Sequence, residues 1–256
     1  MPLWQVRQGA DVLCGNKLDW DILAADPPDI SACQGIIALA GATNGNLGLN
    51  TDLALAAIEL AQRSDCGSVL LTSSAAVYGP SASAMAEDAD CDPANDYGRA
   101  KLTMEQVVTS HVRDLGDTAP LVCILRIGNV GGADALLLAA GRGAVVLDQF
   151  DDGQGPERSY IGILSLARIM TQLIALARQF KALPAILNIA APRPILMTVM
   201  LQAAGVKWDW QPAPAHAMRR MVLDTTRLDT LISPAPLSDD PAEIVRQARC
   251  GGWVPK

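Results

Sequence analysis

The chain has 256 residues, of which half are apolar and 18% are charged, and its formal net charge is −7. This composition excludes an intrinsically disordered protein, because too few charged residues are present to keep the chain solvated. The acidic balance disfavours nucleic acid as a partner, since a nucleic-acid binder needs basic side chains to displace the counterions of phosphates.

The N-terminus, Met1–Trp4, lacks the basic segment and the apolar run of a signal peptide. No apolar run reaches the roughly 18–20 residues that a membrane span needs, and Arg142 interrupts the richest stretch. The six cysteines have no C-x-x-C spacing and do not cluster with the two histidines, so we expect buried, unpaired cysteines and no metal site. We therefore expect a soluble cytoplasmic protein without membrane contacts.

Short apolar runs alternate along the chain with longer segments of helical spacing. Strands are predicted at Val12–Cys14, Gly35–Ala40, Ser68–Thr72, Leu121–Arg126 and Ala185–Ile189. Helices are predicted at Asp52–Arg63, Tyr97–Asp114, Ile163–Phe180 and Ile195–Ala204. This alternation predicts an α/β fold in which helices cover both faces of a doubly wound parallel sheet.

The segment from Lys207 onward differs, because prolines divide it repeatedly. Proline continues neither a helix nor a central strand, so only short elements such as Asp240–Arg249 fit there. We expect this tail to contribute to a small C-terminal lobe.

Two neighbouring motifs carry chemistry. The strand Ser68–Thr72 runs into Ser73 and Ser74, and the next long helix opens with Tyr97 and Lys101. Four residues apart on a helix, the phenol and the ammonium lie on one face, where the ammonium is expected to lower the pKa of the tyrosine. Such a tyrosine can exchange a proton with a carbonyl or alcohol oxygen, and a serine at the strand end can orient that oxygen.

In these two motifs the chain resembles the extended short-chain dehydrogenase/reductases, the NAD-dependent epimerase/dehydratase family, especially proteins of the UDP-galactose 4-epimerase type. The motifs are Ser73-Ser74-Ala75-Ala76-Val77-Tyr78-Gly79 and Asp96-Tyr97-Gly98-Arg99-Ala100-Lys101. The resemblance implies a Rossmann-like dinucleotide-binding domain formed by residues 1–132 and 161–190. It implies a small substrate-binding lobe formed by residues 133–160 and 191–256.

The same resemblance implies roles for individual residues. The catalytic residues would be Ser74, Tyr97, Lys101 and Asn50. The cofactor contacts would come from Leu39, Ala40, Gly41, Thr72, Ser73 and Ile127, together with Tyr97 and Lys101. The substrate contacts would come from Ser74, Ala75, Asn129 and Arg158. Simpler roles stay open for three of these, with Asn50 as a helix N-cap, Asn129 as a turn residue and Arg158 as a solvated loop arginine.

The dinucleotide fingerprint of the family is missing. Family members begin with a strand and a G-x-x-G-x-x-G turn that binds the pyrophosphate at a helix N-terminus, whereas Gly9 and Gly15 are the first glycines here. Val12–Cys14 resembles the family's second strand, and Trp4–Gln8 resembles the end of the preceding helix. We therefore expect a sheet that lacks the first strand and the glycine-rich loop, a loss that would impair cofactor binding.

Two other segments could contact phosphates. Gly41–Gly48 resembles a phosphate loop, but it lies only one βα unit before Ser74, whereas the family places its loop three units earlier. Lys17 follows the second strand and is either a surface lysine or a contact for the 2′-phosphate of NADP.

The function that the resemblance implies is an NAD- or NADP-dependent epimerase or oxidoreductase. Its substrate would be a nucleotide sugar or a similar hydroxyl or carbonyl compound, with Tyr97 as general acid and base. The alternative is a non-catalytic NAD(P)-sensing or scaffold protein of the same fold. Ala75 and Ala76 stand where dehydrating members carry an acid and a base, so we expect no elimination of water.

The resemblance also implies a homodimer. Extended members of the family usually pair through two helices, here Asp52–Arg63 and Tyr97–Asp114. The candidates for apolar contacts at that interface are Leu55, Ile58, Leu102 and Val108, although some of them must face the sheet instead.

Overall fold

The computed structural model describes residues 2–6, 15–24, 26, 28, 30, 33–143, 145–180, 182–232 and 237–255. The predicted strand Val12–Cys14 lies outside these ranges, as does Gly9.

A four-stranded parallel sheet forms the centre of the fold. Its strands are β3 (Ile36–Ala38), β4 (Ser68–Ser74), β5 (Leu121–Ile127) and β10 (Ile186–Ile189), in the order β10-β5-β4-β3. The central residues of β4 and β5 are apolar because both faces of these strands are covered, as is usual in parallel sheets. All four strands were predicted, with ends that differ by at most two residues.

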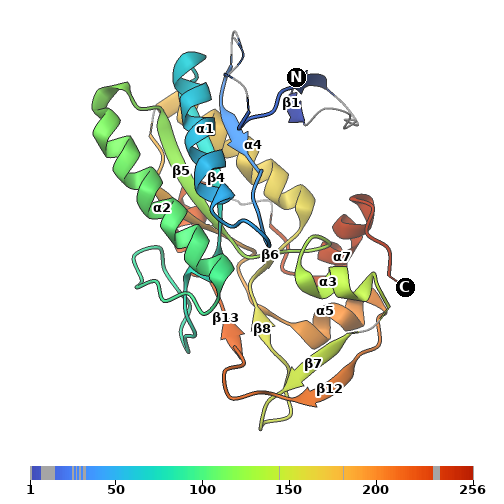
Figure 1. Cartoon of the computed structure of the whole chain (residues 1–256). Coiled ribbons are helices and arrows are strands. Elements are labelled where there is room, and N and C mark those ends of the chain that lie inside the picture. The colour runs from blue at the N-terminus through green and yellow to red at the C-terminus, as the bar shows by residue number, and fades with distance from the viewer. Residues whose placement is uncertain are drawn as a thin grey trace.

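Helices cover both faces of this sheet (Figure 1). Helices α1 (Leu49–Arg63) and α2 (Asp96–Leu115) lie side by side on one face, and α4 (Ile163–Phe180) lies on the other. Successive side chains of a strand point to opposite faces. Accordingly Val69 and Leu71 pack with α1 and α2, whereas Leu70 packs with α4. The predicted doubly wound α/β fold is confirmed.

Most of the short elements that follow β5 lie beside the carboxyl ends of the central strands (Figure 1). Strand β8 (Glu157–Arg158) pairs with β11 (Ile195–Leu196) and β13 (Arg220–Met221), β7 (Val146–Gln149) pairs with β12 (Asp209–Pro212), and β6 (Asn129–Val130) pairs with β9 (Tyr160–Ile161). The helices are α3 (Ala135–Ala140), α5 (Met197–Ala204), α6 (Thr226–Leu231) and α7 (Pro241–Cys250). Three of them, α3, α5 and α7, share an apolar core that includes Leu137, Leu201 and Ile244. Two 3₁₀ helices are also present, η1 (Ala75–Val77) and η2 (Gly116–Thr118).

The prediction of a helix from Ile195 is wrong at its first two residues. Ile195 and Leu196 form β11 and pair with β8 before α5 begins at Met197. Leu196 is the N-cap of α5 and is still extended, with ψ of 136°. The helix therefore starts only after the strand pairing ends.

The N-terminal segment also differs from its prediction. Residues 4–6 do not end a helix but belong to β1 (Leu3–Val6), which pairs in parallel with β2 (Asn16–Asp19) in a separate two-stranded sheet. The aromatic and β-branched side chains of Trp4 and Val6 favour extended backbone. Lys17 lies in β2 with its ammonium 3.2 Å from the carboxylate of Asp19, as expected of a surface lysine.

Two of the four residues predicted at a dimer interface are buried within the chain. Ile58 and Val108 pack between the helices and the sheet and are at most 1% exposed. They cannot contact a second copy, because their side chains fill the core of their own subunit. Leu55 and Leu102 are partly buried, and the homodimer stays a prediction.

Within the part of the chain that the structure describes, no helix combines the length and apolar character needed to cross a membrane. The same residues contain no group of three or more histidine, cysteine, aspartate or glutamate side chains placed to hold a metal ion.

Candidate active site

The site begins where β4 and β5 end together. In the register of these two strands Ser74 is the partner of Ile127, so the carboxyl ends of both strands meet at one edge of the sheet. Beyond Ser74 the chain turns into η1, and the Ser74 hydroxyl accepts a hydrogen bond from the backbone N–H of Ala76 at 3.1 Å. This cap fixes the Ser74 side chain at the strand end.

The start of α2 packs directly against η1. Asn95 caps the helix by accepting a hydrogen bond from the N–H of Gly98 at 2.8 Å. A side chain at Gly98 would place its Cβ 2.1 Å from the carbonyl oxygen of Ala76, so only glycine permits this close approach. Tyr97 is thereby brought to Ser74, with which it shares a hydrogen bond.

Burial controls the protonation of Tyr97. It raises the pKa of the phenol, and the hydrogen bond with Ser74 offsets this only in part. The expectation of a lowered pKa for Tyr97 is therefore wrong in this structure, since the desolvation of the buried phenol outweighs the hydrogen bond with Ser74. Tyr97 carries its proton at neutral pH.

Lys101 lies one helical turn beyond Tyr97 and is 4% exposed. Its ammonium donates a hydrogen bond to the carbonyl oxygen of Thr72 at 2.8 Å. Burial lowers its pKa to about 8, although the nearby carboxylate of Glu105 acts in the opposite direction. A Cβ on Gly41 would lie 3.3 Å from this nitrogen, so the ammonium faces the loop that follows β3.

Asn50 organises that same loop. Its side-chain amide donates to the carbonyl oxygens of Ala42 and Leu47, both at 2.9 Å, and its carbonyl oxygen accepts from the N–H of Ala42 at 3.2 Å. The N-cap position of α1 belongs to Gly48, so the simpler role proposed for Asn50 does not apply. Asn50 instead holds residues 42–47 against the start of the helix.

A cleft of about 280 Å³ opens at this edge of the sheet. Its lining includes five residues predicted from the sequence, namely Ser74, Ala75, Ile127, Asn129 and Arg158. The other lining residues are Ala76, Ala94, Asn95, Gly128, Met218 and Met221. The cleft thus lies between the ends of β4 and β5, the loop before α2, and the C-terminal residues Met218 and Met221.

Arg158 places a positive charge in this cleft. Its guanidinium donates to the backbone carbonyl oxygens of Glu157, Met218 and Arg219 at 2.7 to 3.2 Å. Among the described residues no carboxylate lies within ion-pair distance of it, unlike the neighbouring Arg220, which pairs with Glu157. A cation held by neutral partners is available to an anionic group.

The sequence comparison identifies the domain that carries this site. Residues 34–159 match the model of the NAD dependent epimerase/dehydratase family. This segment belongs to that family. No curated protein matches the chain in sequence.

Solved structures share the fold of this epimerase/dehydratase domain. An NAD dependent NDP-hexosamine 5,6-dehydratase, TunA, is 19% identical with a TM-score of 0.73, over 91% of this chain and 82% of its own. A UDP-glucose-4-epimerase from Stenotrophomonas maltophila is 17% identical with a TM-score of 0.71, over 86% and 77%. A UDP-N-acetylglucosamine 4-epimerase from Methanobrevibacter ruminantium M1 is 15% identical with a TM-score of 0.71, over 91% and 82%.

Several predicted cofactor residues of the epimerase/dehydratase domain do not line the cleft. Leu39, Ala40 and Gly41 form an exposed segment after β3. The Thr72 hydroxyl donates to the carbonyl oxygen of Ala38 at 3.0 Å. The backbone carbonyl oxygen of Thr72 accepts the hydrogen bond from Lys101. The Ser73 hydroxyl is buried and donates to Glu105 at 2.5 Å, away from the cleft.

A buried ion pair beneath the site was not foreseen from the sequence. Arg126 and Glu105 lie 2.7 Å apart with 5% and 3% of their side chains exposed. Arg126 also donates to the hydroxyl of Tyr78 at 2.8 Å, and Tyr78 donates to the side chain of Asn188 at 2.9 Å. The available signals were an arginine inside the apolar run Leu121–Ile127 and a glutamate one turn beyond Lys101.

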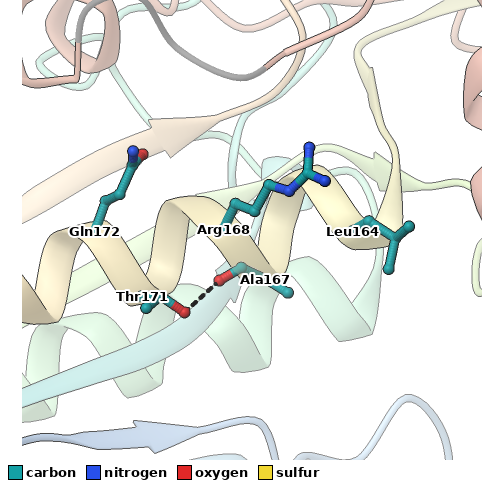
Figure 2. A pocket seen from close by; sticks show the side chains of 5 residues that line it. All are labelled: Leu164, Ala167, Arg168, Thr171 and Gln172. Carbon is teal, nitrogen blue, oxygen red and sulfur yellow. Dashed lines mark hydrogen bonds between the residues drawn. The ribbon is translucent and has the colours of Figure 1, made fainter.

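A larger hollow lies elsewhere, on α4 (Figure 2). It measures about 440 Å³ and is lined by Leu164, Ala167, Arg168, Thr171 and Gln172. Figure 2 shows these side chains along one helix, with the Thr171 hydroxyl donating to the carbonyl oxygen of Ala167 at 2.8 Å. None of the predicted site residues lines it, so we place the candidate active site at the smaller cleft.

Proposed function

We propose that this protein is an NAD-dependent epimerase or oxidoreductase acting on a nucleotide sugar. The observation that carries the proposal is a cleft at the strand ends lined by Ser74, which shares a hydrogen bond with Tyr97, and by Arg158, a cation without an ion-pair partner among the described residues. Related folds support the substrate class and the cofactor, because one solved relative carries bound NAD and formylated UDP-arabinopyranose.

The residues around Lys101 fit the nicotinamide ribose. A buried ammonium has three donors, and among the described residues Lys101 uses one of them, on Thr72. Gly41 leaves the approach to this nitrogen open, so Lys101 and the exposed segment 39–41 would hold the ribose. When bound, NAD supplies the hydride acceptor and donor for a hydroxyl-bearing carbon.

Tyr97 would transfer the proton, and Ser74 would orient the reacting oxygen. Because burial keeps Tyr97 protonated, it acts as the acid that delivers its proton to a carbonyl oxygen, while the Ser74 hydroxyl donates a hydrogen bond to the same oxygen. The oxidation of an alcohol reverses this transfer, and it requires that Tyr97 first release its own proton so that the phenolate can accept the proton of the alcohol. Arg158 would bind a phosphate of the nucleotide, and Asn129, which also lines the cleft, would contact the sugar.

We expect this site to change one carbon centre without eliminating water. Ala75 and Ala76 border the cleft, and their methyl side chains have no ionisable group. The acid and the base that elimination requires are therefore missing at these two positions. General acid–base catalysis contributes about 10²–10⁴ to a rate, so elimination should be slower by about that factor.

The test is to incubate the chain with saturating NAD and a panel of nucleotide sugars, and to follow product mass and stereochemistry. We expect products of unchanged mass, or products that have lost two hydrogen atoms. Rapid formation of a product lighter by one water would contradict this expectation and would point to the chemistry of the dehydratase relative. Calorimetric binding of NAD and nucleotide sugar without any product would instead favour the non-catalytic alternative.

A further inference from the structure

Two cysteines far apart in sequence meet at the opposite end of the sheet. Cys33 precedes β3 and Cys66 precedes β4, and the whole of α1 lies between them. Their sulfur atoms are 2.8 Å apart, and both thiols are free. A disulfide requires a separation of about 2.05 Å, so a closure of about 0.8 Å would join them.

The pair is asymmetric in exposure and acidity. Cys33 is partly exposed, whereas Cys66 is 2% exposed and donates its S–H to the Cys33 sulfur. This hydrogen bond is the main cause that lowers the pKa of Cys33 to about 7, and the same contact together with burial raises the pKa of Cys66. An accessible thiolate beside a protected thiol is the arrangement found in redox-active pairs.

We propose that Cys33 and Cys66 form a reversible redox couple whose disulfide ties edge strand β3 to the start of β4. With a peroxide as oxidant, the Cys33 thiolate attacks one peroxide oxygen, the O–O bond breaks, and the products are a sulfenic acid and hydroxide. The Cys66 sulfur then attacks the Cys33 sulfur and forms the S–S bond, while the sulfenic hydroxyl leaves as water with the Cys66 proton. One peroxide is reduced to two waters as the two thiols are oxidised.

The position of the pair separates this couple from the active site. The cysteines lie at the amino ends of their strands, whereas Ser74 ends the seven-residue strand β4, a length of roughly 20 Å. The disulfide would leave the cleft open and act on β3, a three-residue strand at the edge of the described sheet with Ile37 38% exposed. The inference therefore does not depend on the proposed enzymatic activity.

The test uses the full chain, treated with one equivalent of hydrogen peroxide and then alkylated and digested. We expect an intact mass lighter by two hydrogen atoms, a linked peptide pair that contains Cys33 and Cys66, and full reversal by dithiothreitol. Either a chain that gains only oxygen atoms or a linkage of Cys33 to another cysteine, such as Cys14, would overturn the proposal.

Matched variants add a second readout. Closing a loop of 33 residues should raise the melting temperature of the oxidised chain by roughly 5–10 °C over the reduced chain. We expect this shift to vanish in Cys33→Ser and Cys66→Ala and to persist in Cys250→Ser, whose cysteine is exposed at the end of α7. Cys33 is partly exposed, so its variant should fold even if Cys66→Ala does not. An unchanged shift in Cys33→Ser would also overturn the proposal.

Discussion

Tyr97→Phe should lower the turnover of nucleotide sugar by about 10²–10⁴, the range that general acid–base catalysis contributes. The substitution removes the proton that Tyr97 holds next to Ser74 and leaves the ring, so the affinity for nucleotide sugar should change little. Steady-state kinetics should therefore show a fall in kcat with KM nearly unchanged.

A matched control removes a hydroxyl from the same helix outside the site. Thr103 is exposed, and its hydroxyl donates only to the carbonyl oxygen of Arg99 within α2. Thr103→Val should keep the wild-type rate. A Tyr97→Phe variant that keeps more than about a tenth of the rate would remove Tyr97 from the role of proton carrier.

Arg126→Met should produce the largest loss of stability, about 3–5 kcal/mol, because it leaves the carboxylate of Glu105 buried without its partner. At this chain length the melting temperature should fall by roughly 10 °C. The loss should reach the site as well, since Glu105 accepts the hydrogen bond of Ser73 and sustains the charge of Lys101. Thermal and urea unfolding measure the effect.

Two further variants isolate the cause of that loss. The double variant Arg126→Met with Glu105→Leu should recover much of the stability, because no unpaired charge is then buried. Arg99→Met breaks an exposed ion pair with Asp96 on the same helix and should cost less than about 1 kcal/mol. If the double variant is less stable than Arg126→Met alone, the unpaired carboxylate is not the cause.

The central fold was predictable because its signals are local. The helix Ile163–Phe180 was predicted with the residues that α4 has, since its apolar spacing is regular over its whole length. Strand β4 continues two residues beyond its prediction, through Ser73 and Ser74. These residues pair with Arg126 and Ile127, and polar side chains give no sign of such a backbone ladder.

The wrong secondary-structure predictions arose where family resemblance or apolar spacing was followed in place of the conformational preference of individual residues. Trp4–Gln8 was assigned to a helix by its position relative to the family, although Trp4 and Val6 favour the extended backbone that β1 has. Ile195 continues the apolar spacing of α5, but its strand pairing with Arg158 keeps it extended.

The sequence predicted which residues could share a cleft, and those assignments stay predictions, but it did not predict the electrostatics of the site. Parallel strands end at one edge of a sheet, so the sequence could bring Ser74, Ile127 and Asn129 to one cleft. The pKa of Tyr97 depends on how the whole fold buries the phenol. The four-residue spacing between Tyr97 and Lys101 gives no information about that burial. The contact of Cys33 with Cys66 likewise spans 33 residues and has no motif.

The central claim is that the cleft beside Ser74 and Tyr97 performs nicotinamide chemistry on a nucleotide sugar. The most direct measurement mixes the chain with saturating NAD and UDP-glucose in a single turnover and follows the absorbance of reduced nicotinamide. We predict that this absorbance rises with the wild-type chain and not with Tyr97→Phe, with NAD alone giving no signal. No reduced nicotinamide and no product from the wild-type chain, at concentrations where calorimetry shows both molecules bound, would contradict the claim.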